Sequence, residues 1–383
     1  MPIYFDNAAT SSPKPQAVVR AVQQALTRFN ANPGRSGHPA ALEAARLVLD
    51  ARQKLAELLG AADPMGVIHC FNCTDALNLA IKGSLRAGDH VVATQLEHNS
   101  VLRVLQTLAA RGRITLTLVA PRPDGFVDPA DIRAAITDKT ALIACTHASN
   151  VTGAIQPVAA IGYLARSLGT RCLIDGAQAL GAMPVDVNAL GCDLYAFPGH
   201  KSLLGPQGTG GLYMRKGVEL FPLREGGTGT DSENPYQPGT LPERYESGTL
   251  NLPGIAGLGA GCEYVQSRLS QIMMRERELT QALFEGLSAM PEATLYSPAA
   301  EADRAGIVSF NAGDLTSAQL ADALARRGIA VRGGLHCAPG AHRFLGTLRR
   351  GAVRASLGPE NTFEEVDQFL AALRDILRDP RGA

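Results

Sequence analysis

The chain of 383 residues has the composition of a soluble globular protein, with 45% hydrophobic residues, 19% charged residues and no tryptophan. Its 36 basic residues equal its 36 acidic ones, so nothing indicates a nucleic-acid or membrane-surface partner, each of which would favour a basic excess. The length allows one large domain and a smaller one.

The N-terminal stretch MPIYFDNAATSSPKP has neither a basic start nor an apolar run, so no signal peptide is predicted. No apolar stretch approaches the roughly 20 residues that span a bilayer. The seven cysteines are an odd number spread through apolar segments: Cys70, Cys73, Cys145, Cys172, Cys192, Cys262 and Cys337. This pattern predicts reduced thiols and a cytoplasmic location.

Short apolar runs alternate with amphipathic stretches from residue 66 to about residue 197. Amphipathic stretches at 74–85 and 99–111 predict helices. The expected strands cover residues 66–71, 89–95, 114–120, 140–147, 170–178 and 192–197. This alternation predicts an α/β fold with a mostly parallel sheet, and the nearly continuous apolar character of the strands predicts helices on both faces.

The pattern changes after residue 215. A polar, glycine-rich loop is expected over residues 224–254, and loops of that length are usually functional or disordered. The elements expected beyond it are a long helical stretch over about 255–290, strands at 305–311, 328–334 and 352–357, and helices over 316–327 and 362–378. We therefore expect a large domain over residues 21–255, and a smaller α+β domain formed by residues 1–20 and 256–383.

Two residues after strand ends suggest chemistry. Asp175, in LIDGAQALG, ends a predicted strand, where ligands gather in open parallel sheets. Lys201 follows in a turn rich in histidine and glycine, GHKSLLGPQGTGG. A lysine can bind an aldehyde cofactor as a Schiff base, while a carboxylate keeps a pyridine nitrogen protonated. Separately, Asp175 could be a cap and Lys201 a surface residue, but the pair favours a cofactor site.

Competing motifs are absent from the sequence. It has no dinucleotide-binding GxGxxG after the first strands, no phosphate-binding GxxxxGK[ST] loop and no GxSxG nucleophile elbow. The pair Cys70 and Cys73 forms a CxxC with no second pair at a zinc spacing, so a strand end followed by a turn is expected there and no metal site is predicted.

The chain resembles the class V aminotransferase group of fold type I pyridoxal 5′-phosphate (PLP) enzymes. Within that group it is most similar to the second, SufS-like group of cysteine desulfurases and selenocysteine lyases. The motifs that carry the resemblance run nearly end to end: YFDNAAT, CTDALN, EHNS, SNVTG, IDGAQ, GHKSLLGPQGTGGLY, ESGT, IAVRGGLHCAP and VRASLGPENT. The resemblance implies a large PLP-binding domain with a mostly parallel sheet and a smaller C-terminal α+β domain.

The resemblance also implies residue roles around the cofactor. Lys201 would hold the cofactor and then move the Cα proton of the substrate. Asp175 would pair with the pyridine nitrogen, and Gln178 would hydrogen-bond the phenolic oxygen of the ring. His98 would stack on the ring and assist proton transfer, which suits an imidazole that titrates near neutral pH.

The cofactor phosphate needs hydrogen-bond donors at a helix N-terminus. Cys73 and Thr74 lie where a predicted strand gives way to a helix, although Thr74 could also be only the N-cap. By resemblance, His200 would be another phosphate ligand. Thr249 would reach the cofactor phosphate of a neighbouring subunit, which implies a homodimer with shared active sites. Pro198 replaces the serine or threonine that the family usually carries, so one hydroxyl contact to the phosphate is missing or replaced.

Asn150 and Arg354 resemble the pair that binds the substrate carboxylate, a task that suits the guanidinium fork of arginine. Arg354 could instead be a surface residue, but apolar neighbours flank it and strand alternation places it on the opposite face. Arg332 is a further candidate for the same pocket.

The stretch VRGGLHCAPGAH contains Cys337 between two histidines. A zinc ligand, a buried structural thiol and a nucleophile are all open readings from these residues alone, although the glycines and the proline favour a loop. The resemblance implies that Cys337 accepts sulfur as a persulfide. His336, His342 and Arg343 are candidate cations that would promote ionisation of the thiol.

The resulting expectation is a PLP-dependent enzyme that converts L-cysteine to L-alanine and passes sulfur from Cys337 to an acceptor protein or a small thiol. Three alternatives remain open: a selenocysteine lyase acting on L-selenocysteine, an aminotransferase or lyase acting on another small amino acid, and an inactive scaffold for sulfur or metal-cluster assembly. A scaffold would have no use for Lys201, Asp175 and His98 together.

Overall fold

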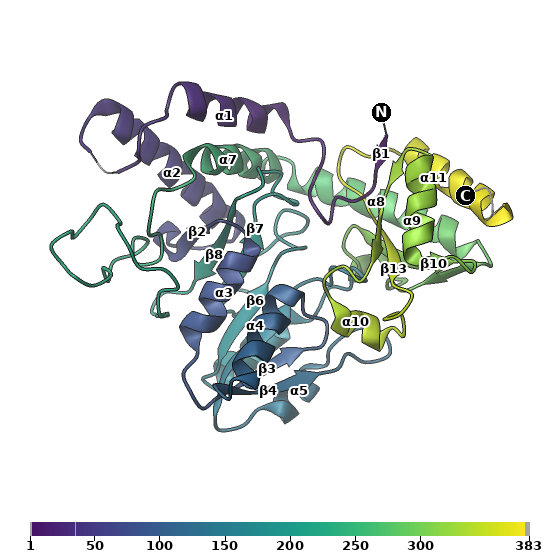
Figure 1. The fold of residues 1–383 in the computed structure, drawn as a ribbon, viewed down its shortest axis with the longest axis horizontal. Coiled ribbons are helices and arrows are strands. Elements are labelled where there is room, and N and C mark those ends of the chain that lie inside the picture. Colours follow the sequence, from purple (N-terminus) through teal and green to yellow (C-terminus); the bar gives the residue numbers. More distant parts are fainter. Residues whose placement is uncertain (1, 35, 380–383) are drawn as a thin grey trace.

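The computed structural model describes residues 2–34 and 36–379. Figure 1 shows a large part built around a long twisted sheet and, beside it, a smaller part formed mainly by the C-terminal third of the chain. The helices of the described residues are α1 Gln16–Thr27, α2 Pro39–Leu58, α3 Cys73–Ser84, α4 Asn99–Ala110, α5 Pro129–Ala135, α6 Val158–Ser167, α7 Leu252–Gln266, α8 Leu269–Ser288, α9 Ser317–Arg326, α10 Pro339–Phe344 and α11 Phe363–Arg378, with short 3₁₀ turns at Pro64–Gly66 and Glu301–Asp303.

The large sheet has the strand order β2-β8-β7-β6-β5-β3-β4. Its strands are β2 Val67–Cys70, β3 Asp89–Thr94, β4 Ile114–Val119, β5 Thr140–Thr146, β6 Arg171–Asp175, β7 Leu194–Pro198 and β8 Gly210–Met214. Neighbouring strands are parallel except at β8, which is antiparallel to both β2 and β7. The predicted mostly parallel sheet is therefore confirmed.

The central strands are apolar throughout because both faces of the sheet are buried. Adjacent strand residues point to opposite faces. Val92 packs in a core with residues of α2, α5 and α6, whereas Val91 packs in a second core with residues of α3 and α4. On β5, Ile143 likewise packs in the first core and Leu142 in the second. Helices thus cover both faces, as the sequence predicts.

The smaller part contains a four-stranded antiparallel sheet in the order β12-β13-β10-β9. Its strands are β9 Ala293–Leu295, β10 Ile307–Ala312, β12 Arg332–Gly334 and β13 Ala352–Ser356. A separate parallel pair joins β1 Ile3–Tyr4 to β11 Ile329–Ala330. The ring centroid of Phe5 lies 5.7 Å from that of Phe369 on α11, so residues near the N-terminus belong to the core of this smaller part.

The proposed division into domains stays a prediction. Its boundaries after residues 20 and 255 fall within α1 and α7, and these two helices pack along each other (Figure 1).

Two expected elements differ in detail from the structure. The helical stretch over 255–290 is two helices, α7 and α8, separated at residues 267–268. It also begins earlier, at Leu252, because the side chain of Asn251 accepts the Gly254 N–H and Pro253 tolerates the first helical turn. The strand expected over 328–334 is two short strands, β11 and β12, which join different sheets.

No helix within residues 2–34 and 36–379 is both long and apolar enough to cross a membrane.

Candidate active site

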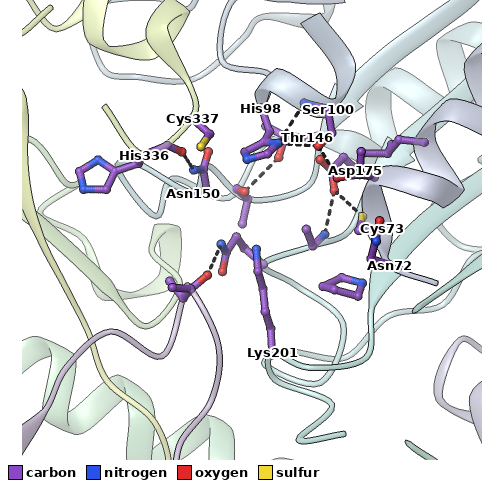
Figure 2. Close-up of a pocket in the computed structure, with 18 of the residues that line it drawn as sticks. Asn72, Cys73, His98, Ser100, Thr146, Asn150, Asp175, Lys201, His336 and Cys337 are labelled. Carbon is purple, nitrogen blue, oxygen red and sulfur yellow. Dashed lines mark hydrogen bonds between the residues drawn. The ribbon is translucent and has the colours of Figure 1, made fainter. Parts of the chain in front are cut away.

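A cavity of about 200 Å³ opens at the carboxyl ends of the parallel strands, between the two parts of the molecule. All the predicted site residues except Thr249 line it: Cys73, Thr74, His98, Asn150, Asp175, Gln178, His200, Lys201, Arg332, Cys337 and Arg354. In Figure 2, the Lys201 side chain points into the cavity, with Asp175 and Cys73 on one side of it and Cys337 and Asn150 on the other.

Asp175 is the last residue of β6, and 4% of it is exposed. Its Oδ1 accepts the Ala177 N–H at 3.0 Å and the Cys73 thiol at 3.6 Å. Burial raises the pKa of Asp175, while these hydrogen bonds and the Lys201 ammonium act in the opposite direction. Such a carboxyl group can share a proton with a basic ring nitrogen placed beside it.

Lys201 follows β7 in a tight turn whose backbone is held by the Leu204 N–H bonding to the Lys201 carbonyl at 2.8 Å. Burial lowers the pKa of Lys201, while Cys73 and Asp175 act to raise it. A lysine with a lowered pKa has more neutral amine, which is the form that attacks a carbonyl group and accepts a proton.

His98 is the N-cap residue of α4, and its Nδ1 accepts the Ser100 N–H at 3.0 Å. Burial lowers its pKa to about 4, and the cations of Lys201, Arg332 and Arg354 add to the effect. The imidazole is therefore neutral at pH 7, and because Nδ1 accepts a backbone N–H, Nε2 carries the proton. The neutral ring can therefore donate a hydrogen bond from Nε2.

The N-terminus of α3 lines the cavity, and its cap is Asn72. The Asn72 side chain accepts the Asp75 N–H at 2.9 Å. The alternative that Thr74 is the N-cap is therefore wrong: an asparagine precedes it and makes the cap. The Thr74 hydroxyl instead lies 2.7 Å from the Ser100 hydroxyl, which also lies 2.9 Å from His98 Nδ1. Thr74 is thereby connected to His98 through Ser100.

Gln178 and His200 line the cavity on the side of the N-terminal strand. The Gln178 amide donates to the Ala8 carbonyl at 3.1 Å. Nδ1 of His200 is buried and has no hydrogen-bond partner among the described residues. Burial lowers the pKa of His200 to about 4. A buried imidazole nitrogen without a partner fits a ligand that completes the site.

Arg354 on β13 is 2% exposed, so the alternative that it is a surface residue is wrong. One guanidinium nitrogen donates to the Asn150 carbonyl at 2.9 Å and another pairs with Asp6 at 3.0 Å. Its Nε is buried without a partner among residues 2–34 and 36–379. Arg332 is opposite Arg354 in the register of β12 and β13. The two guanidinium groups make this end of the cavity suitable for an anion.

Cys337 is exposed and belongs to the loop between β12 and α10, as the glycines and proline predict. His336 and Cys337 both have left-handed backbones, with φ of 48° and 58°. The Cys337 carbonyl accepts the Asn99 N–H at 2.7 Å, and the His336 carbonyl accepts the Asn150 amide at 2.6 Å. These two hydrogen bonds hold the loop against the residues that follow β3 and β5.

The expectation that His336 and His342 are cations beside the thiol is wrong. Burial lowers the pKa of His336 to about 3 and that of His342 to about 4, so both imidazoles are neutral at pH 7. The sequence shows two histidines near Cys337, but their charge depends on burial, which the sequence does not show.

Thr249 lies outside this cavity. It is exposed and lines a smaller hollow of about 30 Å³, together with His69, Phe71 and Arg224. Its expected role concerns the cofactor of a neighbouring subunit, and that role stays a prediction.

Two residues of the site were missed by the sequence analysis. Asn72 could have been found as an Asn followed by a helical pattern, and Ser100 as a first-turn hydroxyl after His98. Among the residues that the structure describes, no three His, Cys, Asp or Glu side chains form a group that could hold a metal ion.

Comparisons with known proteins agree with this geometry. The family model described as aminotransferase class V matches residues 3–369. A probable cysteine desulfurase of Methanothermobacter thermautotrophicus is 37% identical over 382 residues, covering 98% of this chain and 94% of that protein. A cysteine desulfurase of Escherichia coli is 34% identical over 388 residues, covering 99% of this chain and 94% of that protein.

Solved structures give the same result. The apo structure of a cysteine desulfurase from Thermococcus onnurineus NA1 superposes with a TM-score of 0.92 at 34% identity, covering 98% of this chain and 95% of that one. The cysteine desulfurase CsdA of Escherichia coli superposes with a TM-score of 0.89 at 28% identity over the same shares of the two chains. The match over nearly the whole chain, in sequence and in structure, shows that the chain belongs to the class V aminotransferase family.

Proposed function

We propose that the protein is a PLP-dependent cysteine desulfurase that converts L-cysteine to L-alanine and carries the sulfur on Cys337. The observation that carries this proposal is the single cavity that combines Lys201 and Asp175 with the exposed thiol of Cys337 (Figure 2). The names of the relatives and of the solved structures support the same activity.

The residues present fit PLP. Asp175 would pair with the pyridine nitrogen, and His98 would lie against the ring. The N-terminus of α3, with Cys73 and Thr74 in its first turn, would hold the phosphate together with the unpartnered His200. When bound, PLP supplies an aldehyde for the amines of Lys201 and substrate, and a pyridine ring that withdraws electrons from the substrate carbon.

The chain's own residues would carry the remaining steps. Arg354 and Asn150 bind the substrate carboxylate, and Nζ of Lys201 removes the Cα proton. The Cys337 thiolate then attacks the substrate sulfur: an S–S bond forms, the Cβ–S bond breaks and its electron pair stays with carbon. Cβ gains a proton and Lys201 returns the proton to Cα, which gives alanine, and the enzyme thiol becomes a persulfide. The outer sulfur can then pass to an acceptor protein or a small thiol.

We also propose a homodimer in which Thr249 contributes to the partner's site. Large apolar side chains are exposed on α1, α2 and the loop before α7: Val19, Leu26, Leu42, Leu49 and Tyr236. Exposed apolar groups that cluster on one part of a protein commonly mark a protein interface. Thr249 lies in the same loop and is itself exposed.

Alanine release from L-cysteine and from L-selenocysteine tests the proposed reaction. Lys201→Ala is expected to abolish both activities, whereas Lys216→Ala, which changes an exposed lysine, leaves both unchanged. Cys337→Ser is expected to abolish release from L-cysteine and to spare much of the release from L-selenocysteine, because a selenol is a better leaving group.

Undiminished activity on L-cysteine in Cys337→Ser would rule out the persulfide role. A wild-type protein that acts only on L-selenocysteine would indicate a lyase, and one that acts on neither would indicate another small amino acid as the substrate.

A further inference from the structure

Three buried polar side chains lie behind the loop that carries Cys337. His336, His342 and Thr347 are 4%, 0% and 4% exposed. Nδ1 of His336 lies 3.2 Å from Nε2 of His342, and the two rings lie end to end with centroids 5.4 Å apart and planes inclined by 27°. Nδ1 of His342 lies 2.8 Å from the Thr347 hydroxyl, and Nε2 of His336 lies 3.1 Å from the Arg332 carbonyl. The four groups form one continuous row.

The partners determine where each proton lies. A carbonyl oxygen only accepts, so Nε2 of His336 donates to Arg332. Nδ1 of the neutral His336 ring then accepts, so Nε2 of His342 donates to it. Nδ1 of His342 must accept in turn, and the Thr347 hydroxyl donates to it. The row has one direction, from Thr347 to Arg332, and every ring nitrogen is used.

With the protons placed in this direction, both rings are neutral. A second proton on His336 would set two N–H groups against each other at 3.2 Å. Burial and the nearby Arg354 and Arg332 cations lower the pKa of His336, and burial lowers that of His342. The charged groups around the pair therefore favour the same neutral state that the hydrogen bonds require.

The loop needs such support because His336 and Cys337 have consecutive left-handed backbones, which side-chain-bearing residues rarely adopt. On the cavity side, Asn99 and Asn150 hold the two carbonyl groups of these residues. On the opposite side, the ring of His336 points away from the Lys201 side chain and into the row (Figure 2). Hydrogen bonds on both sides of the loop therefore hold the backbone conformation of Cys337.

We propose that the Thr347–His342–His336 row is a positioning device that holds Cys337 where its thiol can reach the substrate sulfur. This inference rests on the proposed function, because it gives the row a purpose in the sulfur step. His336 and His342 are positioning residues, since they act on the reaction through the loop. The row runs from β12 through the loop and α10 to the segment after α10, and its two ends, Arg332 and Thr347, are 15 residues apart in the chain.

A matched pair of substitutions tests the row. The amide nitrogen of glutamine reaches the place of Nε2, so His342→Gln can still donate to His336, whereas His342→Asn reaches only the place of Nδ1. We expect His342→Asn to lose at least about tenfold in alanine release from L-cysteine, because a small misplacement of a reacting group can cost up to about a hundredfold. His342→Gln is expected to stay within about threefold of wild type by the same reasoning.

The PLP content and the cofactor absorption band are expected to match wild type in both variants, because the row does not touch Lys201 or Asp175. Equal loss in His342→Asn and His342→Gln, or wild-type activity in both, would overturn the proposal. A parallel loss of PLP would also overturn it, since that result would indicate general damage to the fold.

Nitrogen NMR of ¹⁵N-histidine-labelled protein tests the row without any turnover. Both rings are expected to be neutral with the proton on Nε2, from pH 8 down to about pH 5.5, given the usual histidine pKa near 6.5. Thr347→Val, compared with Thr347→Ser, is expected to shift only the His342 and His336 signals. A proton on Nδ1 of either ring, or titration of either ring near pH 6.5, would overturn the row. If Cys337→Ser kept full desulfuration activity, the proposed function would be wrong. The NMR measurement would still show whether the row of hydrogen bonds exists, because it needs no turnover.

Discussion

Glu97 is a buried carboxyl group beside His98 that joins two strand ends. It is 0% exposed, and its Oε1 accepts the Thr94 hydroxyl at 2.6 Å and the Thr146 N–H at 2.8 Å. Thr94 and Thr146 are the last residues of the neighbouring strands β3 and β5. Burial raises the pKa of Glu97 to about 8, so the group is mostly uncharged at neutral pH. Glu97 thus fixes the strand ends from which His98 and Asn150 follow.

Substitution of Glu97 separates its hydrogen bonding from its charge. Glu97→Gln keeps an accepting oxygen, so we expect the free energy of unfolding to change by less than about 1 kcal/mol at pH 7. Glu97→Ala leaves a buried N–H and a hydroxyl without their acceptor and creates a cavity, which is expected to cost about 2–4 kcal/mol. Denaturant unfolding of the two variants measures the difference, and equal stabilities would refute the role of Glu97.

For single residues, the sequence predicts which side chains belong to the site better than it predicts their burial and charge. Asp175, Lys201 and His98 were found from motifs, and the structure brings them into one cavity. The charge of His336 was predicted wrongly, and Glu97 was overlooked although it lies inside the EHNS motif. Burial decides both properties, and burial arises from contacts between segments that are far apart in the chain.

At the scale of elements, six of the seven strands of the large sheet overlap their expected ranges, because nearly continuous apolar runs mark strands that are buried on both faces. β3 and β5 lie within one or two residues of their expected limits. The boundaries were less predictable where local signals compete. Residues 328–334 were expected to form one strand, but Ile329 pairs with Ile3 and Arg332 pairs with Arg354 in another sheet. The division of residues 328–334 between two sheets depends on which distant strands they pair with, and the local sequence does not show this.

The whole molecule buries several ionisable groups in their neutral forms, so its stability depends on pH. Burial lowers the pKa to about 4 or below in six histidines: His69, His98, His147, His200, His336 and His342. In the unfolded chain these groups take up protons below about pH 6.5. The unfolded state then binds more protons than the folded state, so their contribution to stability is lost as the pH falls from 6.5 towards 4.

Glu97 and Glu276 act in the opposite direction, because burial raises the pKa of each to about 8. Their contribution is lost as the pH rises from about 4.5 to 8. Between pH 4.5 and 6.5 the six histidine protons outnumber the two glutamate protons, so the free energy of unfolding should rise with pH over this range. Just above pH 6.5 the glutamates are the only members of this set of eight that still titrate, so stability should fall there and its maximum should lie near pH 6.5.

Chemical denaturation of the apoprotein at a series of pH values measures this profile. His342→Gln should reduce the rise in the free energy of unfolding between pH 4.5 and 6.5. Glu97→Gln should reduce its fall above pH 6.5. A stability that is constant between pH 5 and pH 8 would contradict the buried neutral groups.

The site itself is a property of the whole molecule. Its residues come from α3, the ends of β3, β5, β6 and β7, the loop before α10, and β13 (Figure 1). The motifs in the sequence indicate which residues belong to the site, but this inference depends on the resemblance to a family. Their convergence needs the parallel sheet, which brings the strand ends to one edge, and the small C-terminal sheet that faces it.

The position of the transferred sulfur tests the proposed chemistry most directly. Wild-type protein loaded with PLP is treated with L-cysteine in the absence of an acceptor, and its peptides are mapped by mass spectrometry without reduction. We expect one additional sulfur atom on the peptide that contains Cys337, and none in Lys201→Ala. Alanine release without sulfur on Cys337, or sulfur found first on Cys73, the other thiol lining the cavity among the described residues, would contradict the proposal.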